Sequence, residues 1–189
     1  SARCGFSSDL SGPVTDRALF HIDNCYYYPS ASFQSLPLYT NTVSNTAFRG
    51  FGGPQGMIIS ERLIQEIAFK LDMDPLAVRK INFYGSGDRS VTPYFQKIED
   101  NIIPRIVKEL EKTSNYKVRR EGILNYNITN KIFKKGIALT PVKFGISFTA
   151  SWYNQAGALV HIYTDGSVFL NHGGTEMGQG LNTKISQIL

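Results

Sequence analysis

The chain has 189 residues, of which 42% are hydrophobic, and a formal net charge of +5. That content suffices for one domain or two small ones with a real core, and no apolar run approaches the roughly 18 residues of a membrane helix. The N-terminus shows no apolar signal-peptide segment. Two cysteines without CxxC spacing cannot by themselves hold an iron–sulfur cluster or a structural zinc, and they suit a reducing cytoplasm.

Part of the positive charge gathers at residues 117–120 and 131–135. No known nucleic-acid-binding module surrounds these residues, so a solvated face is favoured over a nucleic-acid interface. The three histidines form no HExxH pattern and are interpreted as packing or surface residues rather than metal ligands. We therefore expect no nucleic-acid partner and no metal held directly by this chain.

The first half of the chain predicts mainly helices. Aromatic and apolar residues at 19–28 predict a strand, and a polar, Pro-containing connection follows at 30–41. Apolar positions with a 3.6-residue period predict a helix over 54–71. Asp74 followed by Pro75 combines an N-cap with a first-turn proline, which predicts the start of a further short helix.

The second half changes from helices to strands. An amphipathic helix is expected around 103–110, whereas the polar segment 114–130 is either a further helix or a linker. Alternating apolar residues at 137–148 predict strands. An Asp-Gly pair between the apolar runs 159–163 and 168–170 predicts a hairpin.

The predicted elements divide the chain into two parts. We expect the end of one α+β unit at 1–112, a linker at 113–135 and the opening of a second unit at 136–189. The chain starts without Met and stops inside an apolar-periodic run, so we expect it to be a piece of a longer polypeptide.

The most informative segment is the loop at residues 45–56, which reads NTAFRGFGGPQG. Its glycines allow positive φ and close approach of the backbone to a ligand, and Pro54 marks a helix start. A helix start favours an anion, and Arg49 adds a planar cation. The alternative is a tight turn that contains an Arg. The spacing fits neither a P-loop nor the dinucleotide fingerprint.

A second glycine-rich loop, HGGTEMGQG at residues 172–180, follows the predicted hairpin and precedes a helix-like run from Leu181. Two loops that each open a helix can grip two sides of one polar, phosphorylated ligand. The pair of loops therefore predicts a site for such a ligand.

Several of these segments resemble motifs of the xanthine dehydrogenase and aldehyde oxidase family. Residues 45–55 are similar to its NTAFRGFGGPQ signature, and residues 173–180 to its GGTEMGQG motif. Residues 140–149 are similar to the KFGISFT segment typical of xanthine dehydrogenases, and residues 4–24 resemble the bacterial molybdenum subunit. The resemblance covers nearly the whole chain.

The resemblance implies an α+β fold: part of the molybdenum-cofactor-binding region, with a mixed sheet and packed helices. It also implies a cytoplasmic molybdenum hydroxylase of purine catabolism that oxidises hypoxanthine and xanthine to urate. In that family a molybdenum-bound hydroxide attacks the substrate carbon, and hydride passes to a sulfido ligand. The cofactor is a molybdenum–molybdopterin, and electrons leave through Fe-S and FAD centres on other domains or subunits, which are the expected partners.

The resemblance also assigns roles to residues of this chain. Arg49, with its neighbours Phe48 and Gly50, matches a molybdopterin contact, and Met177 and Gln179 belong to the second cofactor loop. None of them ligates the metal directly.

The substrate residues follow from the same motifs. A purine would stack between Phe51 and Phe148, and Thr149 matches a further substrate contact. Arg17 matches the arginine that faces a purine carbonyl and stabilises the charge of the transition state. Without the motifs, the two rings would be read as core residues, and Arg17 as an ion-pair partner of a neighbouring aspartate.

Two further hypotheses remain open. The family member could instead oxidise aldehydes or another N-heterocycle, or the chain could be a cofactor-binding or assembly module without catalysis. The family's general base is a Glu outside this chain, and Glu176 gives no basis for that role. We expect the chain alone to be inactive.

Overall fold

The computed structural model describes residues 5–146, 148 and 150–189. It divides into two compact units, residues 1–144 (unit 1) and 145–189 (unit 2), and each is described by itself. The helices and strands in chain order are α1 (Ser11–Leu19), α2 (Gly53–Lys70), α3 (Pro75–Asn82), η1 (Gly87–Ser90), α4 (Ile103–Thr113), α5 (Tyr116–Thr129), η2 (Ser151–Tyr153), β1 (Ala158–Ile162), β2 (Val168–His172) and α6 (Leu181–Ile188).

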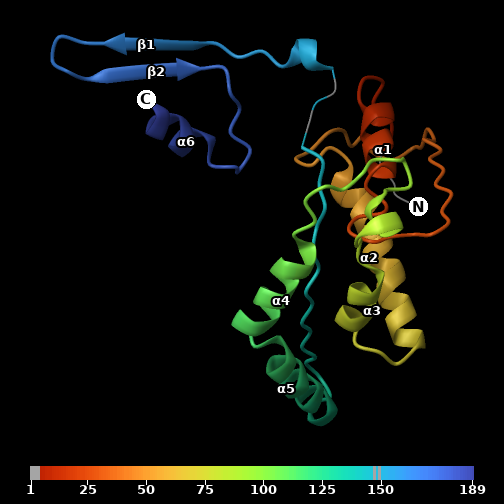
Figure 1. The fold of residues 1–189 in the computed structure, drawn as a ribbon. Helices are drawn as coiled ribbons and strands as arrows, with labels where there is room; N and C mark the ends of the chain where they lie inside the picture. Colours follow the sequence, from red (N-terminus) through yellow and green to blue (C-terminus); the bar gives the residue numbers. More distant parts are fainter. Residues whose placement is uncertain (1–4, 147, 149) are drawn as a thin grey trace. The chain divides into compact units, whose positions relative to one another are not determined.

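Unit 1 is built around the long helix α2. Helix α1 packs against its start, α3 packs against it further along, and α4 packs against α5 (Figure 1). The apolar core draws on these helices and on the segments between them; its buried members are Cys25, Tyr26, Ile64, Ala68, Leu76, Val78, Phe83, Val107, Tyr116 and Leu139. The packing of α1 on α2 therefore positions the residues near the start of α2.

The predicted helix starts are confirmed. Helix α2 begins at Gly53 with a proline in its first turn, and α3 begins at Pro75. Asp74 precedes α3 and accepts a hydrogen bond from the N–H of Leu76 at 2.9 Å, which satisfies one of the donors at the helix start. Of the two alternatives for 114–130, the structure shows the helix, α5.

A buried polar group lies beside the apolar core. The Glu61 carboxylate pairs with Arg79, with 2.9 Å between Oε2 and Nε, and the Arg79 side chain is only 3% exposed. The other carboxylate oxygen accepts hydrogen bonds from Asn24 Nδ2 at 3.0 Å and from Tyr26 Oη at 2.5 Å. Since both oxygens are bonded, α2 is tied through Glu61 to α3 and to the segment after α1.

Two predicted strands are absent from the described residues. The segment 19–28 is the end of α1 followed by turns, and its one sheet-like contact is an isolated bridge from Tyr26 to Phe83. The segment 137–148 has no assigned strand where it is described. Instead of pairing with a strand, residues 141–143 bond to the side chains of Asn24 and Cys25.

Unit 2 contains the predicted hairpin. Strands β1 and β2 pair antiparallel, from Ala158 opposite His172 to Ile162 opposite Val168. The Asp-Gly turn between them has Gly166 at φ +84°, as such a turn requires. The α+β class is confirmed. The sheet in the described residues is this antiparallel pair, where the resemblance implied a mixed sheet.

The predicted division at 112 and 135 remains a prediction. The boundary between the two compact units follows Phe144 in the chain, and the segment 113–135 contains helix α5. Across the described residues, no helix combines the length and apolar character needed to cross a membrane.

Candidate functional site

The first glycine-rich loop forms two successive turns before α2. The N–H of Phe51 donates to the Phe48 carbonyl at 2.8 Å, and the N–H of Gly53 donates to the Gly50 carbonyl at 2.9 Å. Gly50 and Gly52 have φ of +94° and +100°, and Phe51 also has positive φ, at +50°. The left-handed backbone expected from the glycine density is therefore present.

The glycines of this loop allow close packing within unit 1. A Cβ added to Gly52 would lie 2.0 Å from the Val14 carbonyl oxygen, and one on Gly56 would lie 2.1 Å from the Ala18 carbonyl oxygen. Both glycines are buried, whereas the side chains of Phe48 and Arg49 are exposed. The close approach that the sequence assigned to a ligand is thus made by α1, while Phe48 and Arg49 of the same loop are exposed.

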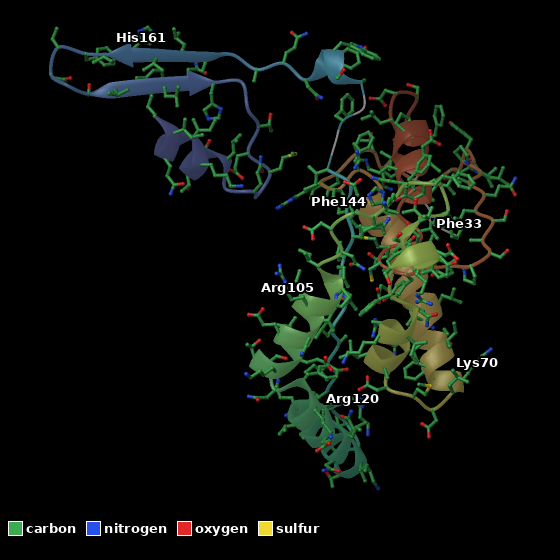
Figure 2. All side chains as sticks on the ribbon, viewed as in Figure 1. Phe33, Lys70, Arg105, Arg120, Phe144 and His161 are labelled. Atoms are coloured by element: carbon green, nitrogen blue, oxygen red, sulfur yellow. The ribbon has the colours of Figure 1, made fainter. Side chains whose placement is uncertain are left out.

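Phe144 lies where three segments of unit 1 meet. A Cβ added to Gly53 would lie 2.4 Å from Phe144 Cε2, so the ring packs directly on the start of α2. The His21 ring lies 4.9 Å from the Phe144 ring between centroids. The guanidinium carbon of Arg17 lies 5.7 Å from the Phe144 centroid, within the range of a cation–π contact. Figure 2 labels Phe144 at this place.

Residues 141–144 form a strap that is bonded to the segment after α1. Asn24 donates from Nδ2 to the Pro141 carbonyl at 3.1 Å and accepts from the Lys143 N–H at 3.1 Å. Asn24 has φ +46°, a conformation that asparagine tolerates better than most residues. Its side chain thus gives the strap the partners that a strand would otherwise supply.

An ion pair holds the same strap from the side. Lys143 Nζ lies 2.7 Å from Asp23 Oδ2 and 2.8 Å from the Tyr94 hydroxyl. The Asp23 side chain is 2% exposed, and its Oδ2 also accepts a hydrogen bond from the Tyr84 hydroxyl at 2.7 Å. Asp23 is thereby engaged by Lys143 and Tyr84. Removing one partner of such a buried pair leaves a charge without compensation, so the pair strongly favours this path of the strap.

His21 follows α1 and contacts both the Arg17 carbonyl and the Phe144 ring of the strap. Burial lowers the pKa of the His21 imidazole. The hydrogen bond that Nδ1 donates to the Arg17 carbonyl at 2.8 Å raises this pKa in part. The positive charges of Arg17 and Lys143 lower it further. The folded state therefore favours the neutral ring.

This lowered pKa predicts a pH dependence of stability. The contribution of neutral His21 is present above pH about 6.5, the value of an unperturbed histidine, and is lost as the pH falls toward the folded-state pKa. We expect the urea midpoint of the chain to drop more between pH 7.5 and 5.5 than that of His21→Gln. An equal drop of the urea midpoint in the two proteins would show that protonation of His21 does not destabilise the folded chain over this pH range.

The second glycine-rich loop is braced by its own side chains. Glu176 accepts hydrogen bonds from the N–H groups of Gly178 at 2.7 Å, Gly180 at 3.1 Å and Leu181 at 2.5 Å. Partial desolvation raises the pKa of the Glu176 carboxyl, but these backbone donors outweigh it and lower the pKa below its ordinary value. The amides at the start of α6 therefore already hold an anion, which the sequence had not indicated.

The predicted cofactor residues of this loop take part in the same bracing. Gln179 accepts from the Met177 N–H at 2.6 Å and donates from Nε2 to the Thr175 carbonyl at 2.8 Å. Met177 is 57% exposed. The amide of Gln179 thus serves the conformation of the loop.

The predicted substrate residues fall in both units. Arg17 and Phe51 belong to unit 1, and Phe148 belongs to unit 2, where its ring lies 6.4 Å from that of Tyr153. Thr149 lies outside the described residues. The shared cleft of Phe51, Phe148 and Arg17 stays a prediction, whereas Arg17 and the first loop are both brought to Phe144 within unit 1.

Sequence reasoning missed the residues that hold this place together: Asp23, Asn24, Lys143 and Phe144. Two signals were available. Lys143 and Phe144 stand inside the segment 140–149 that resembles a family motif, although no role was assigned to them. Asp23 and Asn24 stand at the end of the similar N-terminal segment, but nothing local shows that they bond to a strap more than 115 residues away.

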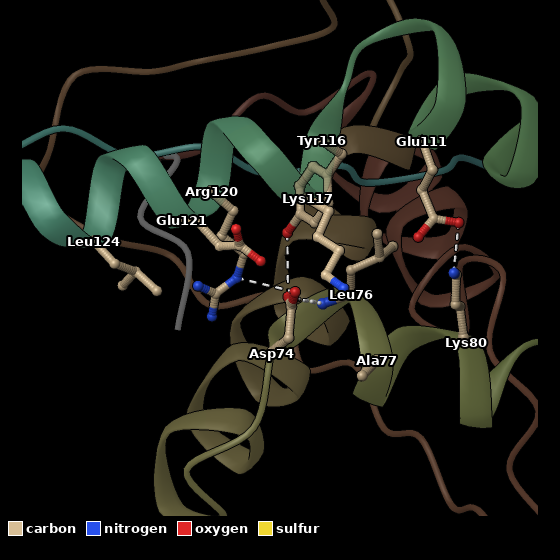
Figure 3. A pocket seen from close by; sticks show the side chains of 10 residues that line it. All are labelled: Asp74, Leu76, Ala77, Lys80, Glu111, Tyr116, Lys117, Arg120, Glu121 and Leu124. Carbon is tan, nitrogen blue, oxygen red and sulfur yellow. Dashed lines mark hydrogen bonds and ion pairs between the residues drawn. The ribbon is translucent and has the colours of Figure 1, made fainter.

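A pocket lies elsewhere in unit 1, between α3, α4 and α5. It has a volume of about 460 Å³, and Figure 3 shows its side chains converging from the three helices. Four of its charged side chains form two ion pairs: Arg120 with Asp74 at 2.9 Å, and Lys80 with Glu111 at 2.5 Å. None of the predicted site residues lines it. We therefore do not treat this pocket as the candidate site.

Comparison with known proteins agrees with the resemblance. Two family models, each described as a molybdopterin cofactor-binding domain, match residues 1–83 and 109–189. The chain thus consists of molybdopterin cofactor-binding domain sequence over most of its length. In the described residues, no group of three or more His, Cys, Asp or Glu side chains could hold a metal ion.

The curated relatives are more specific. The chain is 50% identical over 188 residues to the xanthine dehydrogenase of Blastobotrys adeninivorans, covering 99% of this chain and 13% of that protein. It is 52% identical over 184 residues to the xanthine dehydrogenase/oxidase of Gallus gallus, again covering 13% of the relative. The chain belongs to the xanthine dehydrogenase and aldehyde oxidase family and corresponds to part of its molybdopterin-binding region.

Solved structures agree on the fold. The aldehyde oxidoreductase of Desulfovibrio gigas superposes with a TM-score of 0.56 at 24% sequence identity, covering 88% of this chain and 18% of that one. The corresponding enzyme of Desulfovibrio desulfuricans gives a TM-score of 0.57 at 23% identity. At this identity the likeness concerns the fold alone.

Proposed function

We propose that the chain is part of the molybdopterin-binding region of an enzyme that oxidises purines, xanthine or hypoxanthine to urate. The observation that carries the proposal is the convergence at Phe144. Three segments that resemble separate family motifs, at 4–24, 45–55 and 140–149, meet there through Arg17, Gly53 and the Phe144 ring. Function has to be argued from such a place, where specific residues meet, and not from the fold alone.

The residues of the first loop fit an anionic pterin cofactor. Arg49 is an exposed cation next to the exposed ring of Phe48, and the buried glycines hold the backbone in the left-handed turns that present both. Arg49, Phe48 and Gly50 would hold the cofactor at this loop, and Met177 and Gln179 at the second one. The molybdenum–molybdopterin group supplies the redox chemistry that side chains lack.

The chain's own residues would bind and orient the purine. Phe51 and Phe148 present rings on which a flat heterocycle can stack, with aromatic pair terms of about 0.5–1.5 kcal/mol each. Thr149 offers a hydroxyl for a hydrogen bond. Arg17 places a guanidinium where negative charge develops on the substrate, and a preorganised donor of this kind stabilises the transition state.

Partners and location follow from the same proposal. Electrons from the reaction require Fe-S and FAD centres on another domain or subunit, and the substrate is a small molecule. Burial raises the pKa of the Cys25 thiol to about 12, so it stays protonated and unreactive. A buried free thiol is consistent with the reducing cytoplasm as the compartment of the enzyme.

The proposal is tested on the full-length protein purified with its cofactors. We expect it to convert xanthine to urate with kcat/KM well above that for a simple aromatic aldehyde. The measurement is steady-state turnover of both substrates, with the molybdenum content determined on the same samples. Preference for the aldehyde would favour the alternative substrate class. No turnover of either substrate at full molybdenum occupancy would favour a cofactor-binding module.

A further inference from the structure

The contacts around Phe144 connect three groups that sequence reasoning treated separately. Its ring packs on Gly53 at the start of α2, faces the Arg17 guanidinium at 5.7 Å and lies beside the His21 ring at 4.9 Å. Gly53 is buried, and the lack of a Cβ there creates the seat for the ring. A ring that packs on the backbone and also contacts an arginine through a cation–π interaction restricts the conformations of that arginine.

The position of Phe144 is itself determined by its chain neighbours. Lys143 is bonded through its backbone N–H to Asn24 and through Nζ to the buried carboxylate of Asp23. Asn24 also bonds the Pro141 carbonyl at 3.1 Å. These contacts hold the backbone just before Phe144 at three points, so the ring cannot slide along α2 without breaking a buried ion pair.

We propose that Phe144 is a positioning residue for Arg17, and that Asp23, Asn24 and Lys143 hold Phe144 in place for that task. The proposal rests on the proposed function, because it assigns to Arg17 the role of facing the purine carbonyl. Phe144 acts through Arg17: it fixes the direction of the guanidinium. Preorganisation of such a donor is what makes it effective in the transition state, and small misplacements of catalytic groups are costly.

The first test is Phe144→Leu in the full-length, molybdenum-loaded enzyme. Leucine keeps apolar packing on Gly53 but removes the flat ring. We expect kcat/KM for xanthine to fall about tenfold, mainly through kcat, because a misplacement of about 1 Å can cost up to 10²-fold. Turnover of an aromatic aldehyde, which offers no purine carbonyl to Arg17, should stay within about twofold. Phe69→Leu, an exposed phenylalanine of α2, is the matched control.

A double-variant cycle separates positioning from general support. If Phe144 acts through Arg17, then Phe144→Leu should cause no further loss for xanthine in an enzyme that already carries Arg17→Met. Losses that multiply in the double variant, or equal losses on xanthine and aldehyde, would overturn the inference. If Arg17→Met alone affected both substrates equally, the proposed role of Arg17 would fail instead, so the two failures are distinguishable.

The second test measures the mobility of the strap itself, and it does not require Phe144→Leu to fold well. Asn24→Ala removes the acceptor of the Lys143 N–H, so amide hydrogen exchange in a peptide covering 141–146 should accelerate in the full-length enzyme. The same variant should show a selective loss on xanthine in the direction of Phe144→Leu. Unchanged exchange, or faster exchange without a selective loss, would show that the strap does not position Arg17.

Discussion

Arg17→Met in the full-length enzyme should lower kcat/KM for xanthine by about 10²–10³-fold, the usual cost of removing a preorganised donor from a developing charge. The guanidinium lies at the end of α1 and faces the Phe144 ring, so it is held in a restricted arrangement before substrate arrives. Turnover of a simple aromatic aldehyde should fall much less, because that substrate offers no purine carbonyl. The measurement is steady-state kinetics on both substrates at matched molybdenum content.

Arg17→Lys provides the control for charge alone. Lysine keeps the positive charge but lacks the planar fork of donors and the flat face that lies over Phe144. We expect it to recover only a small part of the activity on xanthine. Equal losses of Arg17→Met on the two substrates would mean that Arg17 supports the fold or the cofactor, and the purine-specific role would be dropped.

Glu61→Ala should be among the most destabilising substitutions in unit 1. It removes both oxygens that bond Asn24, Tyr26 and Arg79, and it leaves the Arg79 guanidinium buried without its carboxylate. Breaking one side of a buried pair costs about 3–5 kcal/mol. We expect a corresponding fall in the free energy of unfolding, measured by urea denaturation of the chain followed by circular dichroism.

Glu66→Ala is the matched control on the same helix. Glu66 pairs with Arg62, but their side chains are 43% and 75% exposed, and such an i,i+4 surface pair contributes about 0.3–0.5 kcal/mol. The two substitutions remove the same side chain from α2 and differ in burial. Similar losses for both would show that the Glu61 contacts contribute no more than a surface pair.

The helices were predictable because their signals are local. Pro54, Pro75 and the cap at Asp74 mark starts that depend on a few neighbouring residues, and the structure confirms them. Helix α1 was not predicted; its proline stands in the first turn, where proline is tolerated. The strand at 19–28 was wrong because its apolar residues are buried by packing between helices and not by neighbouring strands.

The candidate site was predictable only in its individual motifs. The first loop has the left-handed turns that its glycines predict. Arg49 is exposed in this loop, and its role as a ligand contact stays a prediction. No local pattern indicated that α1 and Phe144 would pack closely on the glycines of this loop, because contacts between distant segments leave no such pattern. The strands predicted from the alternation at 137–148 were wrong in the described residues, where the Asn24 side chain bonds the backbone of Pro141 and Lys143.

The bonds between Asn24 and the strap have a consequence for synthesis. Asn24 meets Pro141 and Lys143, 117 and 119 residues further along the chain. At a translation rate of about 5–20 residues per second, the strap emerges roughly 6–24 seconds after its partner. During that interval the carboxylate of Asp23 lacks its lysine, and the seat on Gly53 lacks its ring. Unit 1 therefore completes its fold late, after a wait in which the nascent chain is open to chaperones and proteases.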